Sequence, residues 1–190
     1  MISCGNINKS TIFARRLQRH AQEHGTEWQQ ILADQLEAIS PHCLGLHAEA
    51  KQRLLAARQR FAWLEGDARK TGRFGVDPLV FCNGTLARIA WLQGDPDEAM
   101  ALVDTLVILV RPETMEPSLT HVLGAAASPL ALMSGDLRRA AHYLEIMRSQ
   151  AVLHYLDIWR DYCDCLSAYR DILDGGPNER YPCWRHRSTL

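Results

Sequence analysis

Two histidines and a glutamate near the amino end have the spacing of a zinc site on a helix. His20, Glu23 and His24 match the pattern H-x-x-E-H, the inverted zinc-peptidase motif. Histidines four residues apart share one helix face, so both rings can bind one zinc ion while the glutamate serves as a base. A third ligand and a cleft would also be needed, and the neighbouring residues are strongly polar. We therefore treat these residues as candidate metal ligands but favour the alternative, an exposed polar helix without a metal.

Two other chemical patterns are incomplete. Lys9-Ser10 ends a segment like a phosphate-binding loop, but the glycine whose backbone amide would help to wrap the phosphates is missing before the lysine. Cys163 and Cys165 would lie about 200° apart around a helix, so one metal ion cannot bind both without unwinding it. We therefore expect no catalytic residues, no cofactor and no enzymatic activity.

Composition narrows the class of protein. The 190 residues carry 21 Lys and Arg against 22 Asp and Glu, whereas binding to duplex nucleic acid usually needs a clear basic excess. The 6 cysteines form no C-x-x-C pair, which is typical of reduced thiols in the cytosol. The first ten residues are polar, and the longest apolar run, 106–110, is far too short to span a membrane. We expect a soluble cytoplasmic protein that binds neither nucleic acid nor membranes directly.

The clearest structural signal is a helix end followed at once by a helix start, at residues 89–99. Gly94 can adopt the left-handed backbone conformation that ends a helix. Asp95 suits the N-cap position, and Pro96 suits the first helical position because it has no N–H to satisfy. Ala99 lets the two helices approach, since a larger side chain beside so short a turn would push them apart. The segment predicts a helix–turn–helix hairpin.

The same pattern recurs along the chain. Gly135, Asp136 and Ala140 repeat it, and Gly135 lies 41 residues after Gly94. A weaker copy without the aspartate has Gly45 and Ala50. Repeats of about 35 to 50 residues, each made of one helix pair, are typical of α-solenoids. We therefore predict an all-α fold of antiparallel helix hairpins, a TPR-like α-solenoid of about eight helices.

The remaining signals give a map of the expected elements. Thr26 and Gln29 form a capping box, and Asp77-Pro78 and Glu116-Pro117 are typical helix starts. The expected helices are 8–24, 27–44, 47–62, 78–93, 96–110, 117–134, 137–150 and 153–174, with bends at Pro41 and Pro129 and a long polar loop at 66–76. Residues 1–174 are predicted to form a single domain and residues 175–190 a flexible tail.

Several motifs between residues 73 and 173 carry a family resemblance. They are Arg73-Phe74 with Asp77-Pro78, Leu86-Ala87-Arg88 with Trp91-Leu92, Ala125-Ala126 with Pro129, and Leu156-x-x-Trp159. This region resembles the C-terminal helical repeats of bacterial signal-transduction ATPases of the STAND class, which often carry a winged-helix domain and regulate transcription. The resemblance implies a TPR-like fold that binds effectors or partner proteins, or gates an ATPase. Because this chain has no G-x-x-x-x-G-K-[ST] loop and no winged-helix segment, the resemblance brings neither ATP hydrolysis nor DNA binding.

These observations favour a non-catalytic helical-repeat module for protein–protein interaction or effector sensing. Its expected partner is another protein or another domain of a regulator, because stacked repeats offer an extended surface. One alternative is a truncated piece of such a regulator without independent function, which would expose a large apolar patch at one end. Another is a small zinc hydrolase built on His20, Glu23 and His24.

Overall fold

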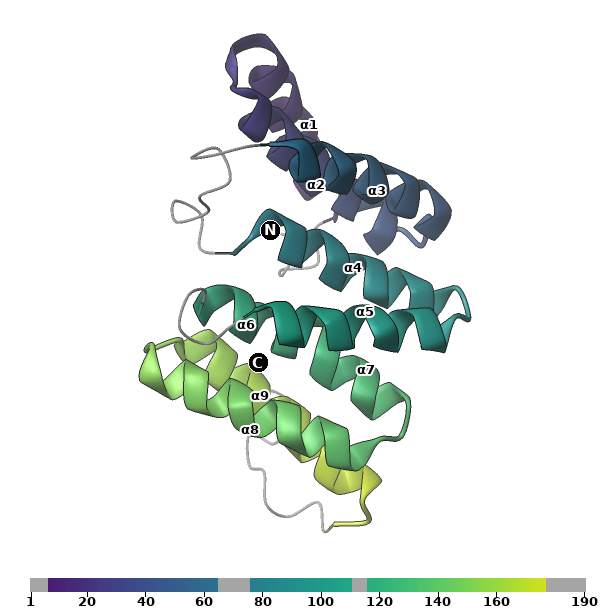
Figure 1. The fold of residues 1–190 in the computed structure, drawn as a ribbon, viewed down its shortest axis with the longest axis vertical. Helices are drawn as coiled ribbons and strands as arrows, with labels where there is room; N and C mark the ends of the chain where they lie inside the picture. Colours follow the sequence, from purple (N-terminus) through teal and green to yellow (C-terminus); the bar gives the residue numbers. More distant parts are fainter. Residues whose placement is uncertain (1–6, 65–75, 111–115, 177–190) are drawn as a thin grey trace. The chain divides into compact units, whose positions relative to one another are not determined.

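The structure is a computed structural model that describes residues 7–64, 76–110 and 116–176 (Figure 1). In these ranges the chain is helical and contains no strand, as the sequence predicts for an all-α helical-repeat fold. The chain divides into two compact units, Met1–Leu106 (unit 1) and Val107–Leu190 (unit 2), which are described separately. Among the described helices, none is both long and apolar enough to cross a membrane. The predicted single domain over 1–174 stays a prediction.

Unit 1 consists of helix hairpins. Its helices are α1 (Ile7–His24), α2 (Glu27–Cys43), α3 (His47–Trp63), α4 (Pro78–Leu92) and α5 (Pro96–Leu109), whose last residues belong to unit 2. Helices that follow one another from α1 to α4 pack side by side. The predicted capping box is present, since the Thr26 hydroxyl accepts from the Gln29 backbone and the Gln29 side chain accepts from the Thr26 N–H. Asp77 caps α4 by accepting from the N–H groups of Leu79 and Val80. The loop predicted at 66–76 lies almost wholly outside the described residues.

The core of unit 1 lies among α2, α3 and α4. Its buried members are Ile31, Ala38, Ala50, Leu54, Ala57, Phe61, Cys82, Leu86 and Ile89. Trp28 packs against this cluster. On another face, Asp34 of α2 accepts from Gln18 of α1 and from Arg60 of α3, so one carboxylate joins three helices. Glu37, also on α2 and 4% exposed, is paired with Arg15 and Arg53, which compensates for its burial.

The predicted glycine–aspartate joints have the expected geometry. Gly94 and Gly135 have φ of 86° and 76°, in the left-handed region. The following residue donates its N–H back to the helix just ended, Asp95 to the Ala90 carbonyl at 2.9 Å and Asp136 to the Ala131 carbonyl at 3.0 Å. These bonds satisfy carbonyls that the helix end leaves open, as in a Schellman motif. Each aspartate then caps the next helix by accepting from the backbone three residues on.

Unit 2 contains α6 (Glu116–Val122), a π-helical segment η3 (Leu123–Ala127), α7 (Ser128–Met133), α8 (Leu137–Leu153) and α9 (Asp157–Leu173). The helix expected at 117–134 is therefore a continuous helical run, but its middle is wider than an α-helix. Ser128 donates its N–H to the Leu123 carbonyl, five residues back. Pro129 accounts for this widening, because a proline has no N–H to donate to the carbonyl four residues before it and its ring crowds that carbonyl. The bends predicted at Pro41 and Pro129 stay predictions.

The joint between α8 and α9 differs from the prediction. The sequence placed a helix end at 150 and a start at 153, whereas α8 continues to Leu153 and α9 begins at Asp157. The joint has no glycine, and Tyr155 takes the left-handed conformation instead, with φ 55°. Leu156 donates its N–H to the Ala151 carbonyl at 2.9 Å, so the hydrogen-bond pattern of the glycine joints is kept.

Candidate protein-binding surface

The zinc-motif residues lie together on a solvent-facing part of α1. His20 and His24 stack edge to face with ring centroids 5.1 Å apart, and the side chains of His24 and Glu23 are 65% and 57% exposed. Across the described ranges, no three His, Cys, Asp or Glu side chains come close enough to share a metal ion. The structure thus brings the rings of His20 and His24 into contact and places Glu23 beside His24, but within the described residues the three candidates do not form a group that could hold a metal ion.

The hairpin-signature residues are structural in their contacts. Ala99 and Ala140 are fully buried, at 0% exposure, behind the joints formed by Gly94-Asp95 and Gly135-Asp136. A Cβ added at Gly94 or Gly135 would meet no atom within 4 Å. These glycines are therefore required by backbone conformation rather than by crowding.

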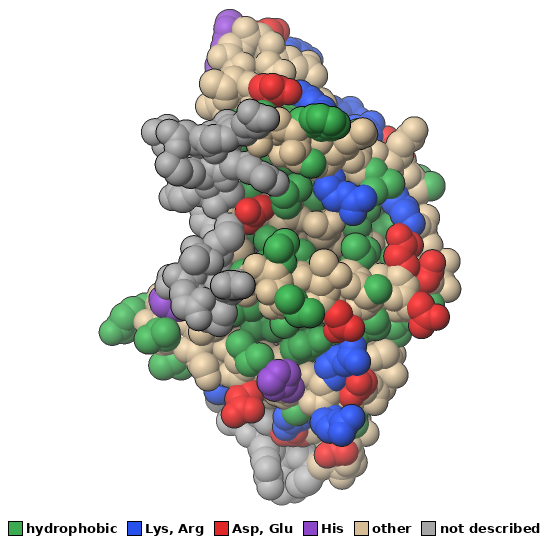
Figure 2. Space-filling model, viewed as in Figure 1, with side chains coloured by type: hydrophobic (Ala, Val, Ile, Leu, Met, Phe, Trp, Pro, Cys, Tyr) green, Lys and Arg blue, Asp and Glu red, His purple; other side chains and the backbone are tan. Residues whose placement is uncertain are grey.

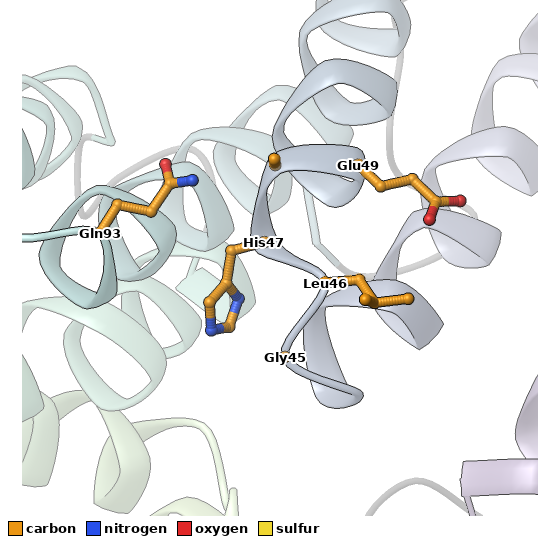
Figure 3. A pocket seen from close by; sticks show the side chains of 6 residues that line it. Gly45, Leu46, His47, Glu49 and Gln93 are labelled. Atoms are coloured by element: carbon orange, nitrogen blue, oxygen red, sulfur yellow. The ribbon is translucent and has the colours of Figure 1, made fainter.

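A shallow pocket lies in unit 1 where the α2–α3 joint meets the end of α4 (Figure 3). Its volume is about 480 Å³, and it is lined by Gly45, Leu46, His47, Ala48, Glu49 and Gln93. In Figure 3, the His47 ring lies on the side of Gln93, while the Glu49 side chain points away from it. The pocket is open, and its polar side chains do not converge on one point, so it has little of the shape of a small-molecule site.

A pair of histidines stands beside this pocket. The Nδ1 atoms of His42 and His47 are 3.3 Å apart, a contact in which one ring donates and the other accepts. The pKa of His42 is lowered to about 4, first by burial and then by the positive charges of Arg88 and His47. His42 is thus neutral at neutral pH, which suits a buried hydrogen-bonded ring.

The neutral state of His42 predicts a pH dependence of stability. Its pKa in the folded chain, about 4, is below the ordinary value of 6.5, so the unfolded chain binds the proton first as pH falls. The contribution of neutral His42 to the free energy of unfolding is present in full well above pH 6.5 and is lost as the pH falls toward the folded pKa. The loss is about 2 kcal/mol between pH 7 and pH 5. Urea unfolding across this pH range measures the effect, and His42→Gln should flatten the profile. Identical profiles for the two proteins would show that His42 does not carry the dependence.

Within unit 2, the side chain of Trp159 packs α9 against η3. A Cβ built on Gly124 in η3 would lie 2.4 Å from Cζ3 of Trp159, so this glycine leaves the space that the indole occupies. The ring also contacts His121 edge to face, with centroids 5.6 Å apart. Behind it, the buried Cys163 donates its thiol to the Leu144 carbonyl of α8. The face of α9 that contains Cys163 is therefore turned toward α8 and η3.

The opposite face of α9 is apolar and exposed. Its residues repeat at alternating spacings of four and three, and we call them the α9 seam: Ile158, Tyr162, Cys165, Tyr169 and Ile172. Ile158 is 77% exposed, Tyr169 47% and Ile172 44%. This spacing puts all the seam side chains in one narrow stripe along the helix. Contiguous apolar surface of this kind is typical of an interaction site.

No protein-family model matches this chain, and no curated protein does either. The surfaces of the chain therefore have to be weighed by their own chemistry. Of the three surfaces, the α9 seam is a better candidate for binding than the open pocket or the polar face of α1, because exposing apolar side chains to water is the least favourable.

The seam continues into an apolar cluster at the α8–α9 joint. Val152, Leu153 and Tyr155 are 58%, 64% and 90% exposed, and Figure 2 shows hydrophobic side chains protruding at the end of α8 and the start of α9. Tyr155 is also strained, because a side chain in the left-handed region costs about 1–2 kcal/mol. A bulky, strained and exposed aromatic residue where glycine would fit better is a candidate functional residue.

Exchanging Tyr155 for glycine is expected to stabilise the fold by about 1 kcal/mol, since the strain is removed and no buried contact is lost. The reverse exchange, Gly135→Tyr, should destabilise by a similar amount, because only backbone strain opposes it at that open position. Thermal unfolding of both variants measures the difference. If Tyr155→Gly were destabilising, the side chain would have a structural role in the joint, and the functional interpretation would be wrong.

Proposed function

We propose that this chain is a non-catalytic helical-repeat module that binds a protein partner along the α9 seam. The observation that supports it is the exposure of that stripe, with Ile158 at 77%, on a helix whose other face is seated by Trp159 and Cys163. An ordinary surface helix turns its apolar stripe inward. On α9 a second apolar stripe, the α9 seam, faces solvent, and a binding role for the seam explains this exposure.

The proposal extends to the setting of the module. The motifs from Arg73 to Trp159 resemble the repeats of STAND-class regulators, so we place the module in a cytoplasmic bacterial regulator of transcription or signalling. In that setting the seam relays binding of a partner or effector to other domains. Stacked hairpins suit this role because each unit contacts its neighbours and leaves a long surface for others.

A second candidate shares the same observation. A piece of a larger regulator would expose an apolar patch where a further repeat packs in the whole protein. In that case the seam is covered by a helix of the same regulator, and the partner is intramolecular. Both candidates use the α9 seam. They differ in whether it contacts a separate protein or another part of the same regulator.

Photo-crosslinking in the native cell tests the proposal. A photoreactive amino acid replaces Ile158 in the seam or, as a control, Ile108, which is 80% exposed on α5 and lies outside the seam. The proposal predicts a discrete protein adduct at position 158 that is absent at position 108, and mass spectrometry of the adduct separates a different protein from a longer form of this regulator. No adduct, or equal adducts at both positions, would refute a binding role for the seam.

A further inference from the structure

We infer that the α9 seam binds an amphipathic α-helix of a partner protein with basic residues beside its apolar stripe. The inference rests on the proposed function and specifies the partner's chemistry. It follows from three properties of α9: the spacing of the seam, its size and the charges beside it.

The spacing selects a helix as the occupant. The seam positions alternate by four and three residues from Ile158 to Ile172, which is the spacing of the a and d positions in a coiled coil. A helix with the same spacing can pack along it at a crossing angle of about 20°. An extended strand repeats every second residue and would match the seam side chains poorly.

The size of the seam sets the length of the partner. From Ile158 to Ile172 the helix rises about 21 Å, so a partner helix of roughly 15 residues or more covers the stripe. Tyr162 and Tyr169 give the seam large side chains of a type enriched among the strongest contacts in interfaces. Ile158 adds its contact next to the exposed Tyr155 at the joint.

The charge beside the seam selects a basic partner. Aspartates stand one residue before most seam positions and form a parallel acidic row: Asp157, Asp161, Asp164 and Asp171. Asp157 is 76% exposed and pairs with Arg160, Asp164 pairs with Arg148 of α8, and the less exposed Asp171 pairs with Arg170. The exposed Asp161, beside the middle of the seam, has no ion pair within the described part of the chain. Lysine or arginine beside the partner's stripe would complement this row.

Two other occupants fit less well. A second copy of the chain packed antiparallel along the seam would bring two acidic rows together, and like charges across an interface cost binding energy. The sequence 177–190 is basic, with Arg180, Arg185 and Arg187, but it lies outside the described residues, and Pro182 in its middle is a poor match to a partner helix of about 15 residues. A separate helix without such breaks combines the required shape and charge.

Synthetic peptides test the inference with the full chain. Three 21-residue probes carry leucine at the a and d positions with lysine beside the stripe, the same leucines with glutamate beside it, or the lysine sequence scrambled. By fluorescence anisotropy, the lysine peptide should bind at least 10-fold more tightly than the others. Ile158→Ser should weaken its binding at least 10-fold, whereas the matched Ile108→Ser should not. Asp161→Lys should reduce the preference for lysine over glutamate several-fold.

The outcomes separate this inference from the proposed function. Equal binding of the lysine and glutamate peptides, or a preference that Asp161→Lys leaves unchanged, would overturn the basic-helix inference, although an adduct at position 158 in cells would still support a binding role. Binding that Ile158→Ser and Ile108→Ser weaken equally would also overturn it. A circular dichroism spectrum identical to that of the parent chain verifies that each variant is folded.

Discussion

Replacing Leu54 by alanine is expected to lower the free energy of unfolding of the chain by about 2–5 kcal/mol. Leu54 is 0% exposed in the core shared by α2, α3 and α4, where it belongs to the same cluster as Ile31 and Ile89. Removing its side chain loses the transfer free energy of the buried carbons and leaves a cavity that rigid helices fill only in part. Since a domain is stable by only about 5–15 kcal/mol, this change removes a large share of the total.

The neighbouring leucine provides the control. Leu55 is 36% exposed on the same helix, and Leu55→Ala removes the same atoms from a partly solvent-exposed position. Its expected cost is about 1 kcal/mol or less, because less apolar area is lost from the interior. Urea unfolding followed by far-ultraviolet circular dichroism compares the two variants with the parent chain. Equal costs at positions 54 and 55 would mean that the face of α3 assigned to the core is wrong.

The second large effect is expected at Gly124, where alanine should destabilise the chain by about 1–3 kcal/mol. In an exposed helix the same change stabilises by up to about 1 kcal/mol, so the predicted sign is reversed. The new Cβ would lie 2.4 Å from Cζ3 of Trp159 and 2.9 Å from Cε of Met147, distances that require the indole to move. Moving the indole disturbs the packing of Trp159 against η3, which positions α9.

A double-mutant cycle isolates this cause. Trp159→Phe removes the part of the indole that the new methyl group would meet, at a cost of its own. Combined with Gly124→Ala, the double variant should be more stable than the sum of the two single effects predicts, with a coupling of about 1 kcal/mol or more. Strict additivity in thermal unfolding would show that the methyl group at position 124 does not press on Trp159.

The hairpin joints could be predicted from the sequence because their chemistry is local. Gly94-Asp95 and Gly135-Asp136 each combine a residue that ends a helix with one that begins the next, and no distant contact is needed for either step. The same holds for Thr26 and for Asp77 as helix caps. The joint at Tyr155 could not be found this way, because a tyrosine in the left-handed region gives no local signal and is held by the helices on both sides.

The candidate surface was missed for a different reason. Periodicity finds an apolar stripe but assumes that it faces inward. On α9 the inner face carries Trp159, Cys163, Ser167 and Ala168, while a second apolar stripe, the α9 seam, faces solvent. A usable signal is that α9 has more apolar residues than one stripe can hold. The π-helical segment η3 also escaped prediction, since the sequence analysis expected Pro129 to bend an α-helix, whereas the helix widens just before the proline.

Thiol labelling of the isolated full chain tests the central claim, an uncovered α9 seam, most directly. Cys165 is an exposed seam residue, whereas Cys163 is 0% exposed and burial raises the pKa of its thiol, which slows its reaction further. With a dilute maleimide probe read by peptide mass spectrometry, Cys165 should react quickly and Cys163 at least 10-fold more slowly, and the lysine peptide should protect Cys165 alone. If Cys165 of the free, dilute chain were as protected as Cys163, the seam would already be covered, and the proposed binding surface would not exist.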